Sequence, residues 1–238
     1  MLRNIFTNYR KHFIHIFILG SLLIQCKTLF AQIDGDDRKY LSIGPKNHGI
    51  GFGNTYDYNG IRLNLWDTHS QNINGFNFSF VLNNQRVNGI QMATFATVSN
   101  HVNGLSVGSL YLSSGTVNGV ATSLFIVCDT INGLVIAHVA GKSKGKTPSV
   151  LNGLDIGIYS GFENVKGVSI AIATKAEHFK GVSIGLQNDA NEMHGIQIGI
   201  INKTQKLKGV QFGLINVAMS NPFWARRLPF INIRLPRS

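Results

Sequence analysis

The segment from Ala140 to Thr147 reads AGKSKGKT, which satisfies the relaxed spacing of a phosphate-binding loop that ends in Gly-Lys-Thr. A working loop of this kind needs a strand before it and, at the Lys-Thr, the N-terminus of a helix that holds the phosphates. Here Pro148 and another strand-like block follow, without any helical pattern. We therefore expect no nucleotide site and interpret residues 141–148 as an inserted basic loop. Its candidate contact residues are Lys142, Lys144 and Lys146.

The other residues that could take part in catalysis or metal binding do not form the sequence pattern of a known kind of site. The histidines occupy no common position of the repeat and lack metal-ligand spacing. Glu163, Glu177 and Glu192 lie in connectors without a second carboxylate on the same strand face. The aspartates within residues 34–37 lack the remaining ligands of a calcium loop. We therefore expect no catalytic residue, no metal and no cofactor, and we predict that the chain is not an enzyme.

Near-identical blocks make up most of the chain and would have to position any functional residue. The marker glycine of each block recurs every fourteen residues in the second half, and at fourteen or fifteen in the first half. The one larger gap, between Gly133 and Gly153, contains the basic loop. The marker glycines are Gly60, Gly75, Gly89, Gly104, Gly119, Gly133, Gly153, Gly167, Gly181, Gly195 and Gly209.

Each block has the pattern of a strand when its marker glycine is counted as position 0. Large apolar residues stand at +1, +3 and +5, and small or polar residues at +2 and +4. We expect the apolar positions, such as Ile184 and Ile198, to fill the core. The even positions would then face solvent as a strip that suits docking of another sheet or a glycan. The candidate binding residues of this strip are Ser169, Ser183, Gln197 and Gln211.

One block cannot fold alone, because its four apolar side chains contribute roughly 2 kcal/mol each against about 1–2 kcal/mol of backbone entropy per residue. The uniform period predicts an all-β fold, a parallel β-solenoid of about eleven repeats of 14–15 residues with a C-terminal cap. The alternative is an antiparallel up-and-down β-barrel of the outer membrane, in which each block is one strand. Alternating short and long turns of a barrel should produce a two-block period, which the sequence lacks.

Composition divides the chain into four parts. Residues 1–31 combine a basic leader, an apolar run and Leu29-Phe30-Ala31, which predicts a cleaved signal peptide and export. We expect residues 32–59 to form an N-terminal tail and cap, residues 60–216 the repeat domain, and residues 217–238 a C-terminal cap or closing strand. Cleavage would leave Cys128 as the one cysteine, which excludes an internal disulfide and a cysteine-based metal site.

The chain is basic, with a formal net charge of +11 at pH 7. Loss of Arg3, Arg10, Lys11 and Lys27 with the signal peptide reduces this charge by four, to +7. The remaining lysines and arginines gather in connectors, in the basic loop and near the C-terminus. A basic rim predicts, as a minor alternative, binding of a polyanion such as lipopolysaccharide or an acidic glycan, without specific contact to nucleic acid.

Three blocks carry a family resemblance: VNGLSVG at Val102–Gly108, MHGIQIGIIN at Met193–Asn202 and LKGVQFGLIN at Leu207–Asn216. They resemble the blocks of surface-repeat proteins of leptospires and Bacteroidota, and the aromatic, proline-containing ending is similar as well. The resemblance implies a location at the cell surface or outer membrane of a diderm bacterium, and it supplies no catalytic residue. We therefore expect an exported, non-catalytic structural or adhesive module with an unknown surface partner, and the outer-membrane barrel remains the alternative.

Overall fold

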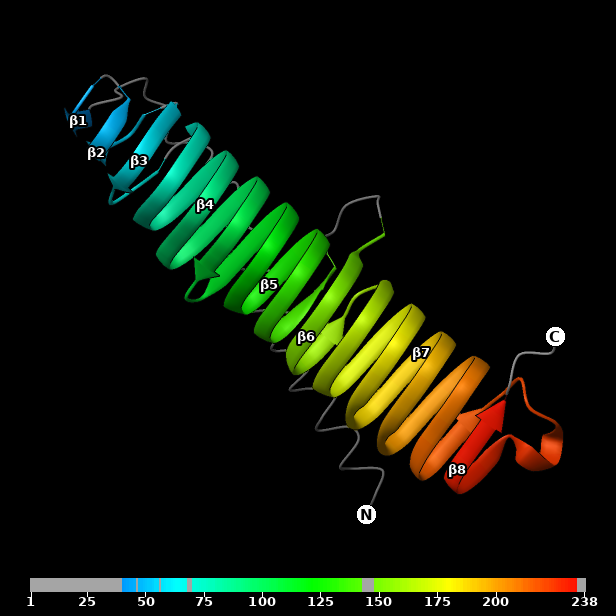
Figure 1. Cartoon of the computed structure of the whole chain (residues 1–238). Helices are drawn as coiled ribbons and strands as arrows, with labels where there is room; N and C mark the ends of the chain where they lie inside the picture. Colours follow the sequence, from blue (N-terminus) through cyan, green and yellow to red (C-terminus); the bar gives the residue numbers. More distant parts are fainter. Residues whose placement is uncertain (1–39, 46, 56, 68–69, 143–147, 235–238) are drawn as a thin grey trace, which may run out of the picture. The chain divides into compact units, whose positions relative to one another are not determined.

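The computed structural model describes residues 40–45, 47–55, 57–67, 70–142 and 148–234 of the chain. They belong to the compact unit Lys39–Ser238, whose strands form one sheet in chain order that winds as a solenoid (Figure 1). The elements are β1 (Tyr40–Ile43), β2 (His48–Gly53), β3 (Asp57–Leu63), β4 (Ser70–Gly108), β5 (Tyr111–Lys142), β6 (Val150–Gly161), β7 (Asn164–Ala218), the 3-10 helix η1 (Phe223–Ala225) and β8 (Arg227–Arg234).

Neighbouring strands from β2 to β7 run parallel and in register. β5 pairs with β6 through Gly133 and Gly153, and β6 pairs with β7 through Gly153 and Gly167. β4, β5 and β7 each continue through more than one coil, so each is longer than one block of the sequence. The predicted parallel β-solenoid is therefore confirmed, and the alternative antiparallel barrel is wrong.

The marker glycines stack on one another at a bend of each coil. Gly181 has a φ of 138°, a region that residues with side chains disfavour, and a Cβ there would clash with the carbonyl oxygen of Gly167. This contact recurs from coil to coil, which explains why glycine recurs at position 0. Gly49 in β2 already pairs with Gly60 in the same stack. The solenoid thus begins inside residues 32–59, which the sequence assigned to a tail and cap.

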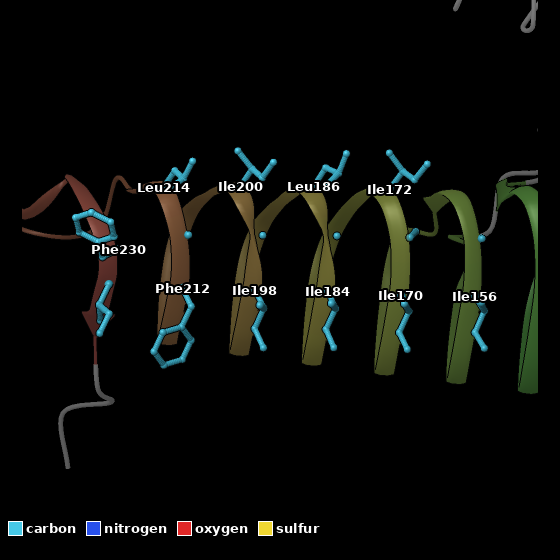
Figure 2. A pocket seen from close by; sticks show the side chains of 16 residues that line it. Ile156, Ile170, Ile172, Ile184, Leu186, Ile198, Ile200, Phe212, Leu214 and Phe230 are labelled. Atoms are coloured by element: carbon cyan, nitrogen blue, oxygen red, sulfur yellow. The ribbon is translucent and has the colours of Figure 1, made fainter.

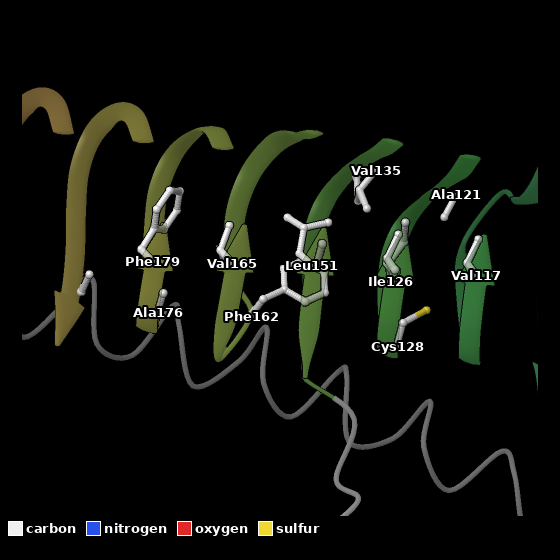
Figure 3. Packing of buried hydrophobic residues seen from close by; sticks show 14 of the residues in the cluster. Val117, Ala121, Ile126, Cys128, Val135, Leu151, Phe162, Val165, Ala176 and Phe179 are labelled. Carbon is white, nitrogen blue, oxygen red and sulfur yellow. The ribbon is translucent and has the colours of Figure 1, made fainter. Parts of the chain in front are cut away.

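The core is a narrow space inside the coils. A large apolar residue two positions before the marker glycine points into it, and in the last coils small residues at +9 line the same space, as Phe179 and Ala176 do in Figure 3. Cys128 occupies one of these +9 positions and is buried. The large inward residues of the last coils are Val165, Phe179, Met193 and Leu207, and the small ones are Ala176, Ala190 and Ala218.

The predicted orientation of the two strand faces is wrong. The +2 residues point into the core, where Ser183 is 0% and Gln197 is 1% exposed, whereas Ile184 and Ile198 are 36% and 41% exposed. The physical reason is space, because each coil already holds a large inward side chain at −2. In the last coils the inward +2 positions therefore hold small or hydrogen-bonding side chains, as a close-packed interior requires.

Buried amides form a hydrogen-bonded ladder inside the last coils. Asn188 Nδ2 donates to Asn202 Oδ1 at 2.9 Å, and Asn202 Nδ2 donates to Asn216 Oδ1 at 2.8 Å. Asn202 also donates to the carbonyl oxygen of Phe212 at 2.8 Å. Position +4 must stay small beside this ladder, because a Cβ at Gly199 would lie 2.6 Å from Asn188 Nδ2. Stacked amides of this kind satisfy each other's polar groups away from water.

A second asparagine ladder runs along the outside of the earlier coils, one residue before each marker glycine. Asn118 donates to Asn103 at 2.8 Å, and Asn103 donates to Asn88 at 2.8 Å. These side chains are exposed, so water competes for the same hydrogen bonds. In the last coils the same position carries a basic or titratable residue: Lys166, Lys180, His194 and Lys208.

Antiparallel strands cover both ends of the described solenoid. β1 pairs antiparallel with β2, and β8 pairs antiparallel with the last coil of β7 after the chain turns through η1. β8 is the predicted C-terminal cap, and it occupies a strand edge that would otherwise template another strand. Near the other end, Arg62 and Asp67 form a fully buried ion pair, and Ser70 donates to Asp67 Oδ1 at 2.7 Å.

Candidate functional site

The outer surface of the +1 to +5 segments forms an apolar face along the solenoid. Two parallel rows of side chains project from it in Figure 2, one from position +3 and one from position +5. The +3 row comprises Ile156, Ile170, Ile184, Ile198 and Phe212, and the +5 row comprises Ile158, Ile172, Leu186, Ile200 and Leu214. Both rows follow from the repeat, since residues at the same position of successive blocks come into register in a parallel solenoid.

An apolar groove lies between the two rows and has a volume of about 980 Å³. Its floor consists of the small residues at position +4, and Phe230 and Ile231 of β8 line its end. A second hollow of about 420 Å³ shares Ile156 and Gly157 with the groove and continues it toward Val107. The floor residues are Gly157, Ala171, Gly185, Gly199 and Gly213.

The apolar face is too exposed and too continuous to be ordinary surface. Leu186 is 53% and Leu214 is 60% exposed. No Lys, Arg, Asp or Glu occupies position +1, +3 or +5 in the blocks from Gly104 to Gly209. Soluble proteins rarely expose contiguous apolar patches larger than about 300–600 Å², and larger ones mark interaction sites. The face is therefore the surface of the described residues best suited to docking.

The residues that the sequence assigned to a binding strip lie inside the coils. Ser169, Ser183, Gln197 and Gln211 are all buried. Gln211 Nε2 donates to Gln197 Oε1 at 2.7 Å, and Ser183 donates to Asn188 Oδ1 at 2.6 Å. These side chains hold neighbouring segments of the core together and cannot contact a partner, so this part of the prediction is wrong.

The predicted basic loop falls largely outside the described residues. Lys144 and Lys146 are among residues 143–147, which the structure leaves out. Lys142 ends β5, and its side chain also lies outside the description. The prediction for this loop therefore stays a prediction.

The other outer face of the last coils carries charged side chains. Glu192 accepts a hydrogen bond from Lys206 Nζ at 2.6 Å and lies 3.1 Å from His178 Nδ1. Lys206 first, and then His178, hold the pKa of Glu192 below its usual value. A shallow hollow of about 160 Å³ on this face is lined in part by Lys166, Lys180 and Glu192. The solenoid is thus two-sided, with one apolar and one charged outer face.

Asp155 is the one member of the +2 positions from Gly104 to Gly209 that carries an acid. It is buried, and Ser169 Oγ donates to its Oδ2 at 3.3 Å. Burial raises the pKa of Asp155 to about 6, against smaller opposing effects of hydrogen bonds from Ser160 and Ser169. The carboxyl group lies inside a coil, beyond the reach of a substrate, so its unusual pKa concerns stability.

Comparison with known proteins identifies no relative. No protein-family profile matches the chain, and no curated protein and no solved structure matches it. Among the described residues, no group of three or more His, Cys, Asp or Glu side chains is placed to hold a metal ion. In the same part of the chain, no helix has the length and hydropathy needed to cross a membrane.

Proposed function

We propose that this chain is an exported, non-catalytic surface-repeat protein that acts as a rigid binding or structural module. The observation that carries the proposal is the apolar face, a continuous exposed surface that the repeat rebuilds in each coil from Gly153 to Gly209. Burial of such side chains against a partner contributes about 25 cal/mol for each Å² removed from water. The basic leader and apolar run of residues 1–31 support export, and the family resemblance supports a location at the cell surface or outer membrane.

A solenoid suits this role because its contacts are local and repetitive. Each coil packs on its neighbours through the glycine stack, and the last coils also through the amide ladder, so the coils together fix the position of the apolar face. The outward apolar residues at +3 and +5 do not belong to the buried core cluster that contains the −2 row. The surface can therefore be changed while the scaffold stays folded.

Fractionation of diderm bacteria that express a tagged chain tests the proposal. We expect leader-cleaved chain at the cell surface, accessible to added protease. A variant with Ile170, Ile184 and Ile198 changed to serine should remain folded and be released from the surface. Uncleaved chain in the cytosol would refute export, and a fully retained variant would refute the role of the apolar face.

A second candidate function is binding of a polyanion by the charged face. The specific observation is the exposed row one residue before the marker glycines, which carries Lys166, Lys180 and Lys208 on stacked coils. A variant with these three lysines changed to serine is the matched control for the apolar-face variant. Loss of binding to lipopolysaccharide in the lysine variant alone would favour this second function.

A further inference from the structure

We propose that the apolar face docks a second copy of this chain, so that two solenoids pack face to face with parallel long axes. This inference rests on the proposed function, because it names the partner of the same face. Three features of the face support it: its size, its lack of charge and the match between its ridges and its groove.

The face is large enough for a stable dimer. The stacked glycines run from Gly49 to Gly209, and at about 4.8 Å per strand this stack is roughly 50 Å long. Five strand residues from +1 to +5 span roughly 16 Å, which gives a face of about 800 Å². A standard protein interface buries about 800 Å² on each partner, so one face meets that size.

The chemistry of the face also suits a copy of itself. Its positions +1, +3 and +5 from Gly49 to Gly209, the same length used for its area, carry no Lys, Arg, Asp or Glu, so self-association brings no like charges together and buries no unpaired charge. The lysines and acids of the same coils, such as Lys206 and Glu192, lie on the other outer face and stay in water. A dimer therefore hides the apolar side and exposes the charged side.

The ridges of the face fit its own groove. The +3 and +5 rows lie two residues apart, about 7 Å along the strand, and the floor between them is the strand backbone at +4, where the Gly or Ala points into the coil. A two-fold axis parallel to the solenoid reverses strand direction in the second copy and keeps the coils in the same order. The +3 row of each copy then seats over the +4 floor of the other, as in a dry interdigitated sheet pair.

This arrangement makes each coil face its own counterpart. Ile198 of one copy lies over Gly199 of the other, and the reverse contact is identical, as an isologous interface requires. The coil spacing is the same in both copies, so the match made at one coil repeats along the groove. Only a second copy necessarily has the same coil spacing. A fluid lipid surface or an unrelated protein does not.

Sedimentation of the purified exported chain over a range of concentrations tests the proposal. We expect twice the monomer mass without detergent. Ile184→Lys and Ile198→Lys should each weaken association at least about ten-fold, because each brings two like charges together across the two-fold axis. Lys180→Ser, on the charged face, is the matched control and should change it less than about two-fold. A monomer at every concentration would overturn the proposal.

Cross-linking with a bis-maleimide tests the geometry without relying on a charged substitution. Single cysteines at 156, 170, 184, 198 and 212 of the +3 row, with Cys26 and Cys128 replaced by alanine, should each cross-link to the same residue of the second copy. Cysteines at 172 or 186 of the +5 row lie further from the two-fold axis and should react less. Cross-linking at one coil only would mean crossed solenoids and would overturn the parallel arrangement.

The same samples separate the other occupants of the face. Monomeric chain that sediments with phosphatidylethanolamine–phosphatidylglycerol vesicles would assign the face to lipid and overturn the dimer. If surface retention needs the apolar face but the purified chain stays monomeric, the dimer fails while the proposed function stands.

Discussion

Replacement of the buried carboxyl group by Asp155→Asn should stabilise the solenoid at neutral pH. Burial raises the folded-state pKa of Asp155 from 3.8 to about 6, so the folded chain holds a proton that the unfolded chain releases between these values. The folding stability therefore falls as pH rises through this window. At about 1.36 kcal/mol for each pKa unit, the loss reaches about 3 kcal/mol above pH 6. The asparagine variant carries no such penalty.

Urea unfolding followed by circular dichroism, at several pH values from about 3.5 to 7.5, measures this effect. The free-energy difference between the variant and the parent chain should grow in favour of the variant by about 3 kcal/mol across that range. The replacement of the side chain itself changes the free energy of unfolding equally at every pH. Only the change of the difference with pH therefore tests the role of the Asp155 charge. A difference that stays constant with pH would refute this role of Asp155.

Glu192→Gln is the matched control because its pH dependence has the opposite sign. Lys206 and His178 lower the folded-state pKa of Glu192, so its contribution to stability is present above the ordinary pKa and is lost as pH falls. The free energy of unfolding of the glutamine variant should therefore fall relative to that of the parent chain as pH rises. The same direction in both variants would mean that a general charge effect, and not burial, governs the response.

Two further changes test the ladders and the glycine stack. Asn202→Ala should destabilise the solenoid by about 2 kcal/mol in urea unfolding, since it leaves buried polar groups unpaired, whereas Asn103→Ala in the exposed ladder should cost about 0.5 kcal/mol or less. Equal costs would contradict the assignment of inner and outer ladders. Gly181→Ala should cost about 1–3 kcal/mol or more in the same assay, because of its positive φ and the carbonyl of Gly167; a neutral effect would contradict the stack.

The repeat predicted the architecture because period and register are properties of the sequence itself. Glycines spaced by fourteen residues, with the same alternation in every block, are compatible with coils that stack in parallel, and Gly153 pairs with Gly167 as that spacing requires. The C-terminal change to aromatic residues and prolines likewise marked the cap that β8 forms. The first coil, at Gly49, was not predicted, because its spacing to Gly60 is shorter than the regular period.

The direction of the faces could not be obtained from alternation alone, since alternation separates two faces without saying which one is inside. The more polar face of a strand is normally assigned to solvent. Here that rule gives the wrong orientation, because the inward Ser183 and Asn188 satisfy each other by a hydrogen bond. The recurring glycine at +4 beside asparagine at +7 carried the necessary signal. Gly199 leaves room for the amides of Asn188 and Asn202, which places both positions inside the coil and the isoleucines outside.

Thiol accessibility at two adjacent residues tests most directly the claim that the isoleucines face outward. Ser183→Cys and Ile184→Cys are made separately in a chain whose Cys26 and Cys128 are alanine, and each is labelled with a maleimide at a concentration where the chain is monomeric. The thiol introduced at position 184 should react like an exposed one. The thiol introduced at position 183 should react at least about a hundred-fold more slowly, through opening of the coil. Fast labelling at position 183 with protection at position 184 would contradict the outward orientation.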